Sequence, residues 1–173
     1  LLLGTELNIM NARGEIDLPD SVLERLDIAI ASIHMPCFKD ERTIDNVTAA
    51  YEKVMEHPYV DIIGHPDDGR FPVDMKRLVK KAKETGTLLE VNNSSLRPEG
   101  FRENTKENCL EMVKECKAQG VMIVLGSDSH VDADIAEYPY AEEILRETDF
   151  PEKLVANVSL EKLKACIKHG KKL

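Results

Sequence analysis

Short apolar runs alternate with amphipathic segments along most of the chain. Continuous apolar runs predict five strands, at residues 1–10, 27–34, 59–65, 87–93 and 121–125. A continuous run, unlike an alternating one, is typical of a parallel strand that is covered on both faces. Apolar residues recur with helical spacing between and after these runs, which predicts helices at 43–57, 74–85, 105–119, 138–148 and 159–169. The alternation predicts right-handed βαβ units and a parallel sheet, which is an α/β fold.

Local signals give the expected helix boundaries. Ser21 and Glu24 match the S-x-x-E capping box, which predicts a short helix over residues 21–26. Gly86 follows Thr85 and is the expected C-cap of the helix that ends there. The helix at 43–57 should bury one apolar stripe, which is formed by Ile44, Val47, Tyr51, Val54 and Met55.

Size, charge and cysteine usage narrow the class of protein. The chain has 173 residues, which fits one domain spanning 1–173, and its net charge is −9. This acidity disfavours nucleic acid as a partner, because non-specific binding to nucleic acid needs a basic surface. No apolar run approaches the roughly 18 residues that cross a membrane, so we expect no membrane association. The 4 cysteines form no C-x-x-C pair, which favours a reducing, cytoplasmic location over a disulfide framework.

Polar side chains that bind metals lie at the ends of the predicted strands. Since the carboxyl ends of parallel strands meet at the same edge of a sheet, these side chains should converge. Carboxylates bridge cations and neutral imidazoles bind zinc, manganese or iron, so the pattern predicts a polynuclear metal site. The residues are Glu6, His34, His65, Asn92 and Asp128, followed by His130.

Each of these residues also has a purely structural interpretation. Glu6 is alternatively a solvated residue of an edge strand, and Asp128 is alternatively a turn residue that caps the next helix, with His130 at the surface. His34 and His65 are alternatively core histidines with hydrogen-bonded ring nitrogens, although two histidines in the same register favour metal binding. No chemistry is assigned to the two histidines at predicted helix ends, where a cation complements the helix dipole, namely His57 and His169.

The motifs that carry these residues resemble those of the PHP (polymerase and histidinol phosphatase) superfamily. The five motifs occur in order over nearly the whole chain, and together they are most similar to the stand-alone YcdX-like phosphatase branch. The resemblance implies a distorted seven-stranded β/α barrel that hydrolyses phosphate esters. The motifs are LLLGTELNI around Glu6, Ser32-Ile33-His34, Ile63-Gly64-His65-Pro66, the segment 89–95 and the segment 125–130.

The same resemblance implies roles for individual residues. Glu6 would bridge two metal ions, and His34 and His65 would complete the ligand set of one of them. Asp128 would bind the other ion of that pair, and His130 would bind a third, so that Glu6 and Asp128 are the catalytic positions. Up to three Zn2+ ions are expected, with Mn2+ or Fe2+ as alternatives. The substrate side would be lined by Arg70, Asn92, Asn93, Ser94 and Ser95.

The sequence departs from the family pattern at its start. Members of the family begin with a strand that carries His-x-His, followed by further His and Asp-His motifs, and none of these occurs here. The sequence therefore suggests an N-terminally truncated, incomplete barrel. Asp128 and His130 would then have too few partners, which predicts partial metal occupancy and impaired activity. Exposed strand edges further predict a homo-oligomer, or association with the missing N-terminal segment.

The activity expected of the whole protein is hydrolysis of a small phosphomonoester by a metal-activated water. Two enzymatic alternatives are a histidinol phosphatase and a PHP-type nuclease or exonuclease, and the acidic charge disfavours the nuclease. A third alternative is a non-catalytic assembly domain, which the set of candidate ligands disfavours. A panel of histidinol phosphate, nucleotides and a short single strand would separate these functions.

Overall fold

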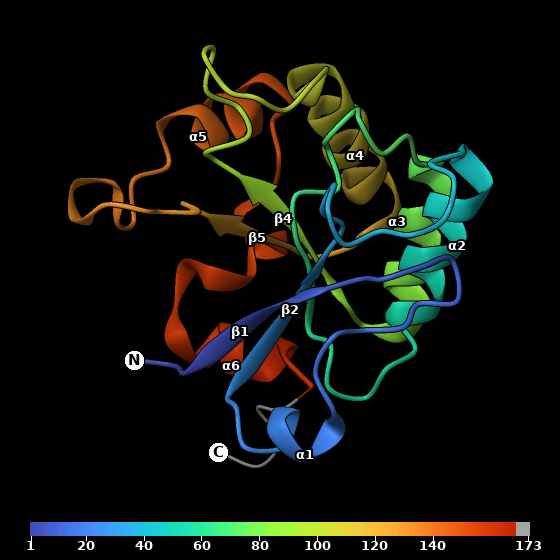
Figure 1. Ribbon diagram of the computed structural model, residues 1–173. Coiled ribbons are helices and arrows are strands. Elements are labelled where there is room, and N and C mark those ends of the chain that lie inside the picture. Colours follow the sequence, from blue (N-terminus) through green and yellow to red (C-terminus); the bar gives the residue numbers. More distant parts are fainter. Residues whose placement is uncertain (169–173) are drawn as a thin grey trace.

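The computed structural model describes residues 1–168, and its centre is a parallel sheet of five strands (Figure 1). Each strand pairs with its neighbours in sequence, so the spatial order is β1-β2-β3-β4-β5 and the two edge strands are β1 and β5. The prediction of five parallel strands in an α/β fold is confirmed. The strands are β1 (Gly4–Asn8), β2 (Ile28–Ser32), β3 (Ile62–Ile63), β4 (Leu88–Asn92) and β5 (Ile123–Gly126).

Helices cover both faces of this sheet. Helices α2 to α5 lie on one side and enclose the larger hydrophobic core, while α6 lies on the other side against a smaller one (Figure 1). The helices are α1 (Asp20–Leu23), α2 (Ile44–Val54), α3 (Met75–Thr85), α4 (Thr105–Gln119), α5 (Pro139–Glu147) and α6 (Leu160–Cys166). Three short 3-10 helices lie at Asp132–Asp134, Glu152–Leu154 and Ala156–Val158.

Capping residues account for several helix ends. The Thr43 side chain accepts a hydrogen bond from the Asn46 N–H at 3.2 Å and so begins α2. Gly86 ends α3 in the left-handed conformation with φ 68°, as predicted. The capping box predicted at Ser21 is wrong, because α1 begins one residue earlier, with Pro19 at the N-cap and no side-chain cap.

The helix packing departs from the prediction at one position. Val47, Tyr51, Val54 and Met55 are buried as expected, but Ile44 is 53% exposed. Ile44 is the first residue of α2, and the core does not extend to this first turn. The helix predicted to end at His169 is α6, and residues 169–173 lie outside the described residues. Within the described part of the chain, every helix is too short or too polar to cross a membrane.

The register of the strands fixes which side chains face α6. Glu6 pairs with Ile30, Ile30 with Ile62, and Ile62 with Leu88. Paired residues share a face, and so do residues two apart on one strand, so Glu90 lies on the same face as Glu6. The sheet thus presents two carboxylates on the face that the larger core does not occupy.

Candidate functional site

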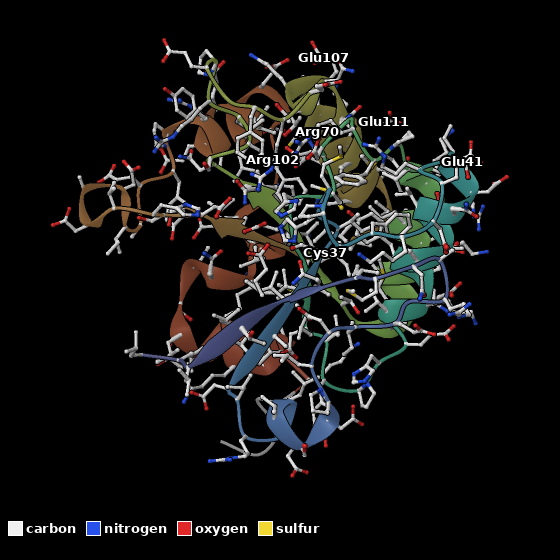
Figure 2. The ribbon with its side chains drawn as sticks, viewed as in Figure 1. Cys37, Glu41, Arg70, Arg102, Glu107 and Glu111 are labelled. Carbon is white, nitrogen blue, oxygen red and sulfur yellow. The ribbon has the colours of Figure 1, made fainter. Side chains whose placement is uncertain are left out.

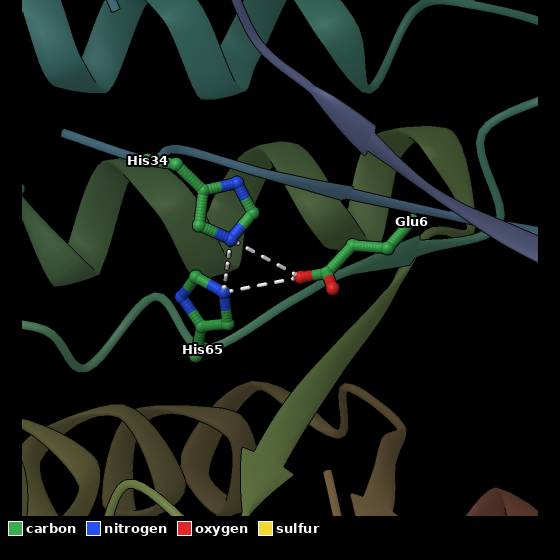
Figure 3. Close-up of side chains that lie close together, drawn as sticks. All are labelled: Glu6, His34 and His65. Atoms are coloured by element: carbon green, nitrogen blue, oxygen red, sulfur yellow. Dashed lines mark hydrogen bonds and ion pairs between the residues drawn. The ribbon is translucent and has the colours of Figure 1, made fainter. Parts of the chain in front are cut away.

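Three predicted ligands meet at the carboxyl edge of the sheet (Figure 3). Glu6 projects from β1, while His34 and His65 each follow the end of their strand by two residues. The Nε2 atom of His65 lies 3.2 Å from Glu6 Oε1 and 3.2 Å from His34 Nε2. The third edge of this triangle, from His34 Nε2 to Glu6 Oε1, is 3.5 Å. We call these residues the Glu6–His34–His65 triangle.

The His34 ring is oriented by a hydrogen-bond chain on the outer side of β1. The Asn8 amide nitrogen donates to Asp17 at 2.6 Å, which leaves its Oδ1 facing His34 Nδ1 at 2.8 Å. Because Oδ1 only accepts, Nδ1 of His34 carries a proton toward Asn8, and Nε2 is the ring nitrogen that faces the triangle. This arrangement is typical of histidines that bind metals, whose second nitrogen donates to a fixed acceptor.

The spacing of the triangle matches a tetrahedral ion. Ligand atoms at roughly 2.0–2.1 Å from zinc lie about 3.3 Å from one another, and the three edges are 3.2, 3.2 and 3.5 Å. Hydrogen bonding to His34 and then to His65 holds the pKa of the Glu6 carboxyl well below its usual range. A carboxylate that stays ionised beside two imidazoles has the donor chemistry that zinc requires. Among residues 1–168, this is the group of His, Cys, Asp or Glu side chains with metal-site spacing.

A second cluster forms around Asp128, beyond the end of β5. Both terminal nitrogens of Arg102 lie 3.2 Å from Asp128 Oδ2, and the Asn92 amide donates to the same oxygen at 3.2 Å. Arg102 also donates to Ser95 Oγ at 2.8 Å, and its side chain is only 8% exposed. Figure 2 shows Arg102 and Arg70 near the end of β4, and their guanidinium groups lie 5.3 and 4.9 Å from the Phe101 ring centroid. We call Asp128, Asn92 and Arg102 the Asp128 cluster.

Glu90 lies between the two groups, and the sequence interpretation did not select it. Its Oε2 accepts the His65 N–H at 2.8 Å and the Asn92 side-chain N–H at 3.1 Å. Burial raises the pKa of this carboxyl. The signal was available in the sequence, since a carboxylate inside an otherwise apolar buried run, Leu89-Glu90-Val91, is costly and calls for a reason.

Two further carboxylates follow His65 and were also missed. Asp68 is buried and forms a bidentate ion pair with Arg70, whose Nη2 lies 2.5 Å from Oδ2. Asp67 is fully buried, and neither of its carboxylate oxygens has a hydrogen-bond partner among residues 1–168. Burial, followed by the charge of Glu90, raises the pKa of Asp67 to about 7. Adjacent acids directly after a strand end were the sequence signal for this pair.

The remaining predicted residues are not part of the triangle. The His130 side chain is 86% exposed, and its Nδ1 lies 3.1 Å from the Asp128 main-chain oxygen. The side-chain oxygen of Asn93 accepts the Tyr140 and Ala141 N–H groups and so holds the start of α5. Ser94 lines an open cavity of about 740 Å³ next to Arg102. The predicted residues thus fall into two groups, the triangle and the Asp128 cluster, with His130 exposed beside the second.

Comparison with known proteins defines the class. No protein-family model matches the chain. A probable phosphatase of Clostridium novyi is 44% identical over 173 residues, which is 100% of this chain and 70% of that protein. A probable phosphatase of Acetivibrio thermocellus is 41% identical over 99% of this chain and 69% of its own length. These relatives place the chain in a class of proteins that are named as probable phosphatases. The chain belongs to the family of these clostridial probable phosphatases.

One solved structure shares the fold. Histidinol phosphate phosphatase from Lactococcus lactis, crystallised with zinc, L-histidinol and phosphate, matches with a TM-score of 0.53 at 15% identity. The match covers 76% of this chain and 61% of the other, so the chain spans less than two thirds of that protein. At this identity the match concerns the arrangement of strands and helices alone.

Proposed function

We propose that residues 1–173 form a PHP-type hydrolase domain that binds zinc and cleaves a small phosphomonoester. The observation that carries this proposal is the Glu6–His34–His65 triangle, whose edges of 3.2, 3.2 and 3.5 Å suit one tetrahedral ion. Its place at the carboxyl edge of a parallel sheet is where α/β enzymes carry their chemistry. The five strands would correspond to part of a distorted (β/α)7 barrel, and the fold shared with the Lactococcus lactis enzyme supports this assignment.

Some of the chain's residues would bind metal ions, and others would contact the substrate. Glu6, His34 and His65 would hold one ion, and Asp128 and His130 are proposed ligands of further ions. Zinc in such a site acidifies a bound water and neutralises charge on phosphoryl oxygens, and Mn2+ or Fe2+ are alternatives. Glu6 and the oxygen of Asp128 that faces away from Arg102 are the proposed catalytic carboxylates.

The substrate side would combine positive charge with hydrogen-bond donors. Arg102 is nearly buried beside Asp128 and offers a guanidinium group suited to a phosphate. Arg70, Asn92, Asn93 and Ser94 are proposed to line the same side, with the cavity next to Ser94 large enough for the alcohol part of a small ester. The four cysteines in residues 1–168 are free thiols, which supports a reducing, cytoplasmic location.

Zinc binding by calorimetry and hydrolysis of p-nitrophenyl phosphate test this proposal together. His34→Asn should lower the zinc affinity at least about tenfold, because one of the three triangle ligands is lost. The matched control is His57→Asn, since His57 lies far from the triangle and contacts Asp20 at 3.2 Å. Equal zinc affinity for the wild type and His34→Asn would contradict the proposed ligand set.

Histidinol phosphate is the second candidate substrate. The observation that favours it is the shared fold with an enzyme crystallised with L-histidinol and phosphate. Turnover rates with histidinol phosphate, a nucleotide monophosphate and a short single strand of DNA would rank the phosphatase, histidinol phosphatase and nuclease functions. Zinc binding without turnover of any of these would favour the non-catalytic alternative.

A further inference from the structure

The Glu90 side chain lies on the face of the sheet toward α6, and its carboxyl reaches His65, Asn92 and Gly126. It projects from the middle of β4 on the same face as Glu6. Ile63 pairs with Leu89, so Gly64 follows beside Glu90, while on β5 Glu90 pairs with Val124 and its carboxyl reaches over Gly126, two residues further along the strand. A single carboxyl thus spans the interval between the triangle and the Asp128 cluster.

Glycine at position 126 makes room for this side chain. A Cβ atom at Gly126 would collide with Oε1 and Cδ of Glu90. A Cβ atom at Gly64 would collide with Ser32 Oγ and would lie 3.5 Å from Glu90 Oε2. Since any larger residue at Gly126 would displace the carboxyl, the end of β5 accommodates Glu90 only because it carries a glycine there.

One oxygen of Glu90 bonds to both parts of the site. Oε2 accepts the His65 main-chain N–H at 2.8 Å, and His65 has φ 32°, a left-handed conformation that is uncommon for a residue other than glycine. The same oxygen accepts the Asn92 amide at 3.1 Å, and Asn92 in turn donates to Asp128 at 3.2 Å. The chain of contacts therefore runs from His65 through Glu90 and Asn92 to Asp128.

Packing does not explain a carboxyl at this position. An apolar side chain of similar size would fill the same volume without the free-energy cost of burying a polar group. What an apolar side chain lacks is the acceptor that holds the His65 main chain and the Asn92 amide. Glu90 therefore serves to hold the His65 main chain and the Asn92 amide in place, and not to fill the core.

We propose that Glu90 is a positioning residue that sets the angle of the His65 ring in the triangle and couples it to Asp128. It binds neither metal nor substrate and acts through the main chain of His65 and the side chain of Asn92. This inference rests on the proposed metal binding by the Glu6–His34–His65 triangle. Glu90 is therefore a part of the proposed site that the set of metal ligands does not include.

The test compares cobalt binding by Glu90→Leu and Glu90→Gln, using the visible absorption of tetrahedral Co2+ as the signature. Glu90→Leu removes the acceptor and should weaken Co2+ binding about ten- to hundredfold, the range seen when groups that orient metal ligands are lost. Glu90→Gln keeps one acceptor oxygen of similar reach and should recover most of the affinity and the wild-type spectrum. Circular dichroism establishes that both variants are folded.

Asp61→Asn is the matched control. Asp61 is equally buried at the opposite end of β3, where its carboxylate accepts the Ala29 N–H at 2.9 Å. This variant should lower stability and leave the Co2+ affinity unchanged. The inference is overturned if Glu90→Leu binds Co2+ as the wild type does, if Glu90→Gln is as weak as Glu90→Leu, or if Asp61→Asn weakens binding equally. A wild-type chain that binds no Co2+ would instead overturn the proposed metal site itself, and this inference with it.

Discussion

Replacing Asp67 should remove a loss of stability that the wild-type chain undergoes as the pH rises toward neutrality. Asp67 is fully buried, and its two carboxylate oxygens have no hydrogen-bond partner among the described residues. Burial and the charge of Glu90 raise the pKa of Asp67 from 3.8 to about 7. The folded state therefore holds the proton of Asp67 more tightly than the unfolded state does.

The sign of the effect follows from proton linkage. Below about pH 4 the carboxyl is protonated in both states and its titration costs no stability. As the pH rises, the unfolded state releases the proton first, so the folded state loses stability until the pH passes about 7. The difference between 3.8 and about 7 corresponds to about 4 kcal/mol in total, of which about 2.5 kcal/mol falls between about pH 5 and about pH 8.

Denaturant unfolding of the wild type and Asp67→Asn at these two pH values measures the effect. A chelator is present throughout, so that no bound cation contributes to the charge around Asp67. The stability of the variant relative to the wild type should rise by about 2.5 kcal/mol from about pH 5 to about pH 8. Asp67→Leu serves as the control, because it also lacks the titrating group and should show the same rise despite different packing. A relative stability that does not change with pH would refute the reasoning.

Three further substitutions test the fold and the glycine beside Glu90. Met112→Ala should lower the free energy of unfolding by denaturant by about 2–5 kcal/mol, because Met112 belongs to α4 and is fully buried. A loss below about 1 kcal/mol would contradict the described packing. Thr43→Ala should cost about 0.5–2 kcal/mol because it removes the cap on the Asn46 N–H, whereas Thr43→Ser should restore most of it. Gly126→Ala should cost about 1–3 kcal/mol by forcing the Glu90 side chain aside, and thermal unfolding that matches the wild type would show that the side chain has room to move.

The sequence was sufficient to predict the parts of the fold that depend on short-range pattern. The five strands and the helix over Thr105–Gln119 follow from apolar runs and helical spacing. The triangle was also predictable, because residues at the ends of successive parallel strands share one edge of the sheet. His34 and His65 therefore came together with Glu6 as expected from the register alone.

The rest of the site depends on the directions of side chains, which the pattern of apolar and polar residues does not predict. His130 follows Asp128 by two residues, yet φ 49° at Asp128 turns the chain and leaves the His130 ring exposed. Arg102 comes from a loop without periodicity, so its contact with Asp128 appears only once the loop is placed. Glu90 was visible as a carboxylate in an apolar run, but its contacts with His65 and Asn92, and the space at Gly126, appear only in the folded chain.

The order of the strands in the sheet has a consequence for how the protein is made. Because β1 to β5 occur in the same order in the chain and in the sheet, each strand finds its partner already synthesised when it leaves the ribosome. Pairing between strands that follow one another in the chain keeps the loops that must close shorter than a sheet with a crossed strand order would need. Glu6, His34 and His65 belong to β1 and to the segments that follow β2 and β3, and β4 then brings the carboxyl that accepts the His65 N–H. Pulse-labelled hydrogen exchange on stalled nascent chains should accordingly show protection of β1 to β4 before the segment that carries Asp128 has been translated.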